Sequence, residues 1–325
     1  MKTHIESRQF VIMLVGLLCV FMLSGCSKTQ QPVSISTHMW PGYEPISLAN
    51  SLGWLDQSKV KLVETESFTD SIKLLEEGKI DAAGLTLDEV LRLREKGIGL
   101  SVVLVCDVSA GADMLLVRPN IKSLADIKGR RIAVEEGALG SLMLYQVLKA
   151  AGLKKEDVKI VSVAVDHQAE AWKRGEIDAA ISFEPGSSQV LSLGGKVLFD
   201  SRQIPELIFD VIAVRTSVLD SAHEDAIRHL VESHLKGLHY INRNPDDASF
   251  RMAPRFKLSP DQVMETFKGL VLPDLQNNIR LLHSDKSTIL TSASVVADAM
   301  LKAGILHQPP DMTDLVRSEY LPATE

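Results

Sequence analysis

The sequence predicts an α/β protein built from two lobes of similar topology. Two observations support this. Short apolar runs typical of strands alternate with amphipathic stretches typical of helices along most of the chain. In addition, a group of residues in the first half recurs in the second half with the same spacing. The 325 residues are enough for two domains, each with a core of its own.

The N-terminus has the pattern of a lipoprotein signal peptide. Lys2 and Arg8 form a basic start, Phe10 to Leu23 is continuously apolar, and Leu23-Ser24-Gly25-Cys26 resembles the bacterial lipobox. We therefore expect residues 1–25 to be removed and Cys26 to be acylated, with 26–32 as a tether. The predicted location is the cell envelope, with the protein held to the membrane by its N-terminal lipid and facing the periplasm or the exterior.

Composition excludes several classes of function. Lys and Arg number 35 against 42 Asp and Glu, without a basic run, so we expect no nucleic-acid partner. Cys106 would be the only cysteine left besides the lipidated Cys26, so we expect no disulfide and a buried Cys106. No nucleophile, phosphate-loop or dinucleotide motif is present, so we predict neither an enzyme nor a cofactor. Four histidines lack the i, i+4 spacing of a metal pair, and no metal is expected: His223, His229, His234 and His239.

The elements fall into two blocks followed by a helical end. In the first block we expect strands at 60–64, 80–84 and 100–106 and helices at 46–55, 71–77 and 87–96. In the second we expect strands at 114–117, 131–134, 159–163, 177–181 and 196–199 and helices at 139–151, 168–174 and 185–193. Apolar stripes predict helices at 227–241 and 289–304, and residues 309–325 are expected to be weakly ordered.

The recurring residues indicate that the two blocks are alike. The stretch 76–83 contains Gly78-Lys-Ile-Asp-Ala-Ala, and the stretch 173–180 contains Gly175-Glu-Ile-Asp-Ala-Ala, 97 residues later. Both glycines are predicted to end a helix in the left-handed conformation. The strands 114–118 and 211–215 are also similar and 97 residues apart. We infer two lobes joined near these strands, with a cleft between them and a hinge beneath it.

The first predicted strand ends in a loop with two aromatic residues. Val33 and Ile35 alternate with serines, and Trp40-Pro-Gly-Tyr43 follows before a helix. Small-molecule sites in α/β proteins lie outside the carboxyl ends of strands, so Trp40 and Tyr43 are candidate ligand contacts exposed on a turn. The alternative is that they pack the helix against the edge of the sheet.

The order of several motifs resembles a known family. These are Trp40-Pro-Gly-Tyr-Glu-Pro45, 48–54, the two Gly-x-Ile-Asp-Ala-Ala stretches, Gly111-Ala-Asp113, 123–134 and Glu184-Pro185. They resemble the solute-binding proteins of nitrate, sulfonate, taurine and bicarbonate ABC transporters, among which binders of thiamine-pyrimidine precursors are close relatives. The resemblance implies the two-lobe type II periplasmic-binding-protein fold, each lobe a mixed β-sheet flanked by helices. Lobe one would comprise 33–116 plus 214–325, with the helical extension, and lobe two 117–213.

Further candidate contacts lie at the ends of strands and the starts of helices. Backbone N–H groups at a helix N-terminus can hold an oxygen acceptor without a charged side chain. For each residue, a helix cap is an equally good explanation, since Ser, Thr and Asp occupy such positions for stability alone. The candidates are Thr69, Ser71, Thr86, Asp107, Ser109, Gly137, Ser141 and Glu184.

Acidic residues dominate these loops. A small free anion would face carboxylates with little compensation, so we expect an amine-bearing or heteroaromatic solute ahead of a sulfonate or nitrate, although helix N-termini could still hold a sulfonate. The acidic residues are Glu44, Asp70, Asp88, Asp107, Asp113, Glu136 and Glu184.

We therefore predict a monomeric, lipid-anchored solute-binding protein that closes two lobes on a small organic solute and delivers it to an ABC permease. One alternative is a lipoprotein that reports the bound solute to a membrane sensor kinase or cyclase. A third, ranked lower, is an enzyme of the same fold, related to those of menaquinone and pyrimidine synthesis.

Overall fold

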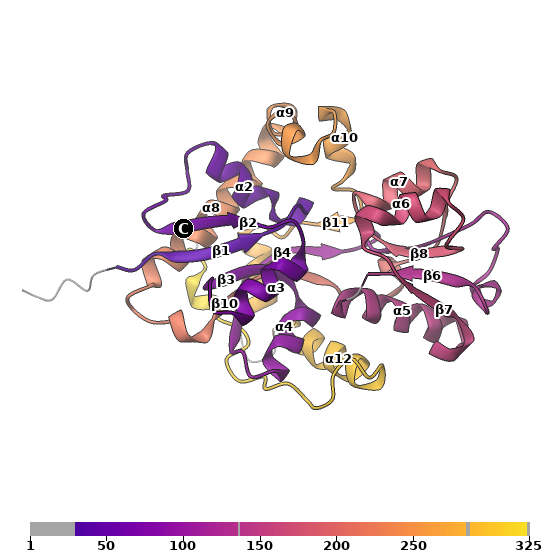
Figure 1. Ribbon diagram of the computed structural model, residues 1–325. Helices are drawn as coiled ribbons and strands as arrows, with labels where there is room; N and C mark the ends of the chain where they lie inside the picture. The colour runs from indigo at the N-terminus through magenta and orange to yellow at the C-terminus, as the bar shows by residue number, and fades with distance from the viewer. Residues whose placement is uncertain (1–29, 136, 284–286, 324–325) are drawn as a thin grey trace, which may run out of the picture.

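Two β-sheets, each flanked by helices, form two lobes that lie side by side (Figure 1). The computed structural model describes residues 30–135, 137–283 and 287–323. The predicted signal peptide and Cys26 lie outside the described residues. Among the described helices, none combines the length and apolarity needed to cross a membrane.

The sheet of lobe one has six strands. Its order is β11-β4-β10-β3-β1-β2, in which β2, β1 and β3 are parallel and β10 runs antiparallel to both β3 and β4. The strands are β1 (Val33–Thr37), β2 (Val60–Glu64), β3 (Ala82–Thr86), β4 (Leu100–Ser109), β10 (Phe209–Arg215) and β11 (Leu270–Val271). The helices are η1 (Pro41–Tyr43), α2 (Glu44–Ser51), α3 (Phe68–Glu76), α4 (Leu87–Glu95), η5 (Thr216–Val218), α8 (Glu224–Arg243), α9 (Pro245–Phe256), α10 (Pro260–Glu265), α11 (Leu275–Leu282), α12 (Thr288–Lys302) and η6 (Ser318–Tyr320).

The sheet of lobe two has five strands in the order β7-β6-β8-β5-β9. Here β7, β6 and β8 are parallel, and β5 is antiparallel to β8 and β9. The strands are β5 (Met114–Val117), β6 (Arg131–Val134), β7 (Lys159–Ser162), β8 (Ala179–Ser182) and β9 (Lys196–Asp200). The helices are η2 (Leu124–Ile127), α5 (Ala138–Ala151), η3 (Lys155–Asp157), α6 (Val165–Lys173), α7 (Gly186–Ser192) and η4 (Ser201–Gln203).

The predicted repeat is present in the backbone and in its hydrogen bonds. Gly78 and Gly175 both have positive φ, at 68° and 70°, as the residue after a helix requires. The aspartate that follows each glycine ties two strands together. Asp81 Oδ2 accepts a 2.8 Å hydrogen bond from Ser34 N, and Asp178 Oδ2 accepts a 3.0 Å bond from Arg131 N. Each donor lies 97 residues from its counterpart.

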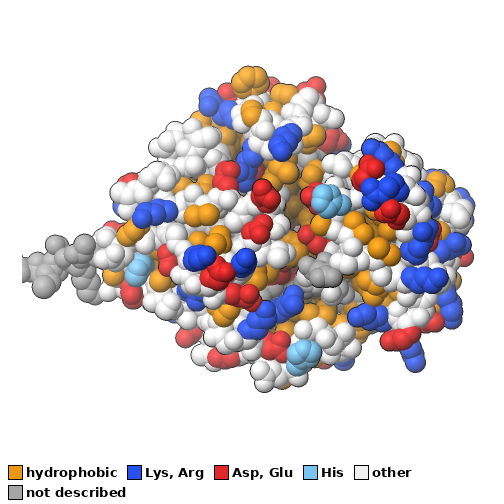
Figure 2. Space-filling model, viewed as in Figure 1, with side chains coloured by type: hydrophobic (Ala, Val, Ile, Leu, Met, Phe, Trp, Pro, Cys, Tyr) orange, Lys and Arg blue, Asp and Glu red, His pale blue; other side chains and the backbone are white. Residues whose placement is uncertain are grey.

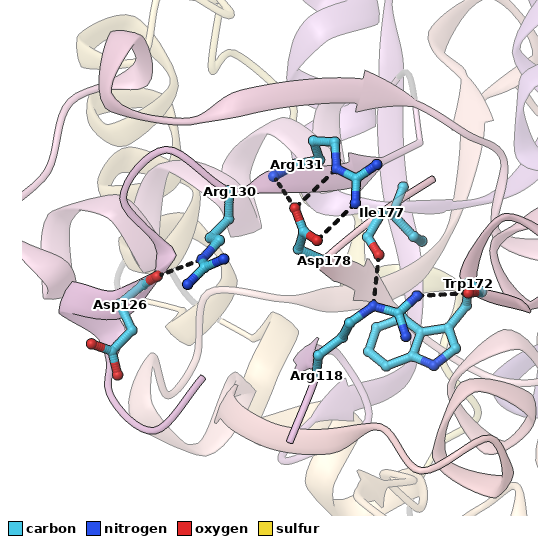
Figure 3. A network of polar contacts seen from close by, with 7 residues as sticks. All are labelled: Arg118, Asp126, Arg130, Arg131, Trp172, Ile177 and Asp178. Atoms are coloured by element: carbon cyan, nitrogen blue, oxygen red, sulfur yellow. Dashed lines mark hydrogen bonds and ion pairs between the residues drawn. The ribbon is translucent and has the colours of Figure 1, made fainter. Parts of the chain in front are cut away.

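A second pair of hydrogen bonds is repeated at the same spacing of 97 residues. Arg118 Nε donates to Ile177 O at 3.1 Å, and Arg215 Nε donates to Ile80 O at 3.2 Å. Figure 3 shows these hydrogen bonds in lobe two, where the Arg131 guanidinium also donates two hydrogen bonds to the Asp178 carboxylate. These bonds join strand ends and helix ends within a lobe, so the shared motif holds the fold together.

Two short segments carry the chain between the lobes. The first runs from Ser109 to Met114, and the second from Asp200 to Phe209. They are hydrogen-bonded to each other, because Ser109 Oγ lies 2.7 Å from Ser201 Oγ and Gly111 N donates to Ser201 Oγ at 2.6 Å. These two segments, the crossings between the lobes, precede the predicted boundaries at 116/117 and 213/214. We propose that the lobe boundaries lie within them.

The C-terminal end differs from the prediction. Residues 309–323 are not a weakly ordered tail, because Val316 forms a bridge to Val102 and Tyr320 is buried. Arg94 donates from Nε to Asp311 O at 2.6 Å. The end of the chain therefore extends the packing of lobe one. Cys106 is a buried residue of β4, as predicted.

Candidate functional site

A small pocket lies where the two lobes meet. Its volume is about 20 Å³, which is room for roughly one water molecule. A solute larger than a water molecule therefore does not fit into the pocket as its side chains stand. In Figure 2 hydrophobic side chains line the furrow between the lobes on the face shown, and acidic side chains lie beside it. The pocket is lined by His38, Trp40, Phe68, Thr86, Glu89, Asp113, Leu139, Phe183 and Asp210.

Aromatic side chains from opposite lobes close the pocket. The Trp40 ring of lobe one meets the Phe183 ring of lobe two edge to face, with centroids 5.7 Å apart and planes at 90°. Gly137 of lobe two lies against Phe68 of lobe one, where a β-carbon would be only 2.9 Å from the Phe68 ring. A planar solute placed between Trp40 and Phe183 would replace this contact between the lobes.

The turn that carries Trp40 and Tyr43 is anchored in the sheet. Trp40 Nε1 donates to Asp107 Oδ2 at 2.9 Å, and the Tyr43 hydroxyl donates to Asp210 Oδ1 at 2.6 Å. Trp40 is 5% exposed and Tyr43 is 1% exposed. The prediction that both rings are exposed on the turn was therefore wrong, because both polar tips find buried carboxyl partners. Trp40 still lines the pocket, whereas Tyr43 lies behind it.

Gly42 makes the close approach of the turn possible. A β-carbon at Gly42 would lie 1.6 Å from Asp107 Oδ2. We expect Gly42→Ala to break the Trp40–Asp107 hydrogen bond and to lower the free energy of unfolding by about 1–3 kcal/mol, measured by urea denaturation. The combination Gly42→Ala/Asp107→Ala removes the clash, so its effect should be smaller than the sum of the two single changes. Additive effects would contradict this contact.

Five carboxyl groups are buried around the pocket, two of them brought together by the sheet register. Asp210 on β10 lies opposite Thr86 on β3 and opposite Asp107 on β4, so the antiparallel insertion of β10 places it between them. Asp88 and Glu89 follow in the first turn of α4, and Asp113 lies in the first crossing segment. All five are buried.

Burial raises the pKa of each of these carboxyls. The pKa of Asp113 and of Asp88 is raised to about 6, that of Asp107 to about 7 and that of Glu89 to about 8. The pKa of Asp210 lies well above its usual range, through burial and then the neighbouring Asp107. Burial lowers the pKa of His38 to about 4, so its imidazole is neutral. The group thus holds protons that a cation could displace.

Some polar atoms at the pocket have no hydrogen-bond partner among the described residues. They include Asp113 Oδ2 and His38 Nδ1, which belong to lining residues, and Asp107 Oδ1 on β4, opposite the lining residue Asp210. A buried polar atom without a partner costs free energy that a bound donor would recover. Two of the three are carboxyl oxygens, so a solute with N–H donors suits them. No described group of three or more His, Cys, Asp or Glu is arranged to hold a metal ion.

The other predicted contacts lie at varying distances from the pocket. Thr86 lines it, while Ser109 binds Ser201 in the crossings and Ser71 binds Thr65 Oγ1 at 2.8 Å. Glu184 follows Phe183 and accepts from Ser188 Oγ at 2.8 Å. Thr69, Gly137 and Ser141 instead line open grooves of about 750 and 950 Å³ beside the pocket. Ligand contact by each of these residues stays a prediction.

Sequence reasoning missed several lining residues. His38 adjoins Trp40 in the singled-out loop, and Phe183 precedes Glu184, so proximity to predicted contacts could have indicated them. Asp210 gave no such signal, because it reaches the pocket only through the pairing of β10 with β3 and β4. Phe68 and Glu89 were also missed, whereas Leu139 lies between the candidates Gly137 and Ser141.

Comparison with known proteins places this site in a family. The family model described as NMT1/THI5 like matches residues 40–248, which include the aromatic turn, both crossings and all of lobe two. The chain belongs to the NMT1/THI5-like family. In this member, the matched stretch contains every residue that lines the pocket except His38.

Relatives and solved structures agree with this assignment. The taurine-binding periplasmic protein of Escherichia coli is 24% identical over 222 residues, covering 66% of this chain and 69% of the relative. The structure of the periplasmic aliphatic sulphonate binding protein SsuA from Escherichia coli superimposes with a TM-score of 0.73 at 18% identity, covering 89% of this chain and 98% of that one. The alkanesulfonate-binding protein SsuA from Xanthomonas axonopodis pv. citri, bound to MOPS, gives 0.71 at 18% identity, covering 86% and 96%.

These likenesses confirm the predicted fold. The two helix-flanked sheets have the architecture of a periplasmic binding protein. The relatives named above are periplasmic solute-binding proteins of the sulfonate and taurine type, rather than enzymes.

Proposed function

We propose that this protein captures a small organic solute carrying an amine or a protonated heteroaromatic ring in the pocket between its lobes. The observation that carries the proposal is the composition of the pocket: Glu89, Asp113 and Asp210 line it, and no described Lys or Arg does. A cation with N–H donors would pair with these carboxyls when they lose their protons. Trp40 and Phe183 would contact its flat faces or edges.

Two of the helix N-termini at the site, those of α3 and α4, favour a cation over an anion. Thr86 caps the N-terminus of α4, its backbone N–H donates to Glu89 Oε2 at 3.0 Å, and Asp88 and Glu89 occupy the first turn of the helix. Ser67 caps the N-terminus of α3, which carries Asp70 in its first turn. At these two helices, carboxyl groups therefore already occupy the positions where an N-terminus would bind a sulfonate, whereas the first turn of α5 has no acidic residue.

A thermal-shift screen of residues 27–325 tests the proposal. The panel comprises benzamidine, 4-aminopyrimidine, primary amines, taurine, MOPS and nitrate. A ligand at one hundred times its dissociation constant adds about 2.7 kcal/mol of stability. We expect a shift with a cationic amine or amidine that disappears in Trp40→Ala. Stabilisation only by MOPS or nitrate would contradict the acidic-pocket argument, while leaving the fold and a binding role intact.

We further propose that the protein is anchored by a lipid at Cys26 and hands its solute to an ABC permease. The support is the lipobox-like sequence together with the transport-associated relatives. One chain supplies both walls of the pocket, so a monomer suffices. We expect Cys26→Ser to release the protein from the membrane fraction and to reduce uptake of the radiolabelled solute by intact cells. Membrane attachment that persists in this variant would contradict the lipid anchor, and unchanged uptake would contradict a need for anchoring in transport.

A further inference from the structure

An ion cluster outside the pocket connects α9 to the aromatic turn. Arg255 Nε lies 2.7 Å from Glu44 Oε1, and its Nη1 pairs with Glu64. Glu44 is only 1% exposed, while the Arg255 side chain is 19% exposed. Arg255 lies near the end of α9, which sits above α2 in Figure 1 and belongs to the helical extension of lobe one. The extension thus reaches the segment that carries Trp40.

Glu44 is placed to transmit this contact to the pocket. It is the first residue of α2, and its backbone N–H donates to Pro41 O across the η1 turn. Tyr43 immediately precedes it. Burial raises the pKa of Glu44 to about 7, and Arg255 opposes that rise. Without Arg255, the pKa of Glu44 would rise further, so the buried carboxyl would take up a proton and lose the ion pair that fixes its position. The turn should therefore rearrange if Arg255 is lost.

The charge of Arg255 also affects His38, at the other end of the segment 38–44. His38 lines the pocket, and its ring meets the Tyr43 ring edge to face at 5.2 Å between centroids. After burial, the charge of Arg255 is the next cause that keeps the His38 imidazole neutral. A neutral imidazole does not repel a cationic solute. Arg255 therefore acts on both ends of the segment 38–44 without lining the pocket.

We propose that Arg255 is a positioning residue for the solute site, holding the segment 38–44 in place through the buried carboxylate of Glu44. Its effect on solute affinity rests on the function proposed above, whereas its effect on the order of the segment does not. A salt bridge that served only the fold would change global stability without acting specifically on this segment.

Hydrogen exchange of the ligand-free chain tests the positioning role. We expect Arg255→Gln to accelerate amide exchange at least tenfold in peptides covering 38–46 and to leave lobe two unchanged. The matched control is Arg251→Gln, one turn earlier on α9, where Arg251 Nε pairs with the exposed Asp247 at 2.5 Å. Unchanged exchange in 38–46, or equal acceleration over the whole chain, would overturn the proposal.

Two further variants keep the test decisive. If Arg255→Gln does not fold, Arg255→Lys retains the charge but loses the fixed guanidinium geometry, and it should show a smaller, localised acceleration. Glu44→Gln/Arg255→Gln removes both charges and should restore part of the protection against exchange.

Benzamidine binding, measured by calorimetry, should weaken about tenfold in Arg255→Gln and not in Arg251→Gln. Equal affinity in wild type and Arg255→Gln would overturn the effect on the site, whereas a wild type that binds no panel member would refute the proposed function alone.

Discussion

Replacing Asp113 by Asn is expected to reduce affinity for a cationic solute about 10- to 100-fold. Asp113 Oδ2 is buried at the pocket without a described partner. A hydrogen bond to a charged group contributes about 1.5–3 kcal/mol, which corresponds to this loss. Asn keeps the shape of the side chain but cannot ionise, so affinity should fall while the fold remains. Isothermal titration with the best amine of the screen measures the change.

The stability of the ligand-free Asp113→Asn variant distinguishes a loss of affinity from a loss of folding. Because burial keeps Asp113 largely protonated below its raised pKa, a neutral Asn should leave the stability of the ligand-free protein equal or slightly higher. Asp166→Asn provides the control, since Asp166 is an exposed residue of α6. Amine affinity that is unchanged in Asp113→Asn would remove this carboxyl from the site.

Raising the pH from 5 to 8 is expected to weaken the ligand-free fold and to strengthen amine binding. The folded-state pKa values of Asp113, Asp107 and Glu89 are about 6, 7 and 8, against about 4 in unfolded chains. The folded state therefore binds more protons in this range. The stability that these groups contribute is complete below pH 4 and is lost as the pH rises through 6 to 8. At about 1.4 kcal/mol per pKa unit, loss of the Asp113 proton between pH 5 and 8 should by itself cost about 1.4 kcal/mol, and Asp107 and Glu89 add to this loss.

The same protons control binding. A cation replaces them, so affinity should increase about tenfold per pH unit for each proton released. Urea denaturation without solute and titration with the amine, both at pH 5, 6, 7 and 8, give the two curves. Stability that stays constant over this range, or an amine affinity that falls as the pH rises, would contradict the cluster of buried carboxyls.

Local signals were enough to predict most of the fold. Gly78 and Gly175 end helices through a conformation that only the adjacent residues determine, and the spacing of 97 residues between them revealed the two similar lobes. The strands at 60–64, 114–117 and 131–134 have the predicted bounds, because their apolar runs are flanked by clear turn residues.

Long-range pairing explains what the sequence did not reveal. Residues 309–323 carry few local signals, yet Val316 pairs with Val102 from the first half of the chain. Likewise, the sequence predicted that the rings of Trp40 and Tyr43 are exposed on a turn. Nothing nearby in the sequence indicates that Asp107 and Asp210 accept their hydrogen bonds. The acidic character of the site, in contrast, was visible in the composition of the loops.

Proton release during binding tests the central claim most directly. Calorimetric titration of the mature chain at pH 6, in buffers of different ionisation enthalpy, counts the protons exchanged when the best cationic amine or amidine binds. A ligand that stays fully protonated at this pH leaves the protein as the source. Release of about one or more protons per solute is the predicted result, since the cation takes the place of carboxyl protons at Asp113 and its neighbours. Binding with no proton release, or with proton uptake, would contradict it.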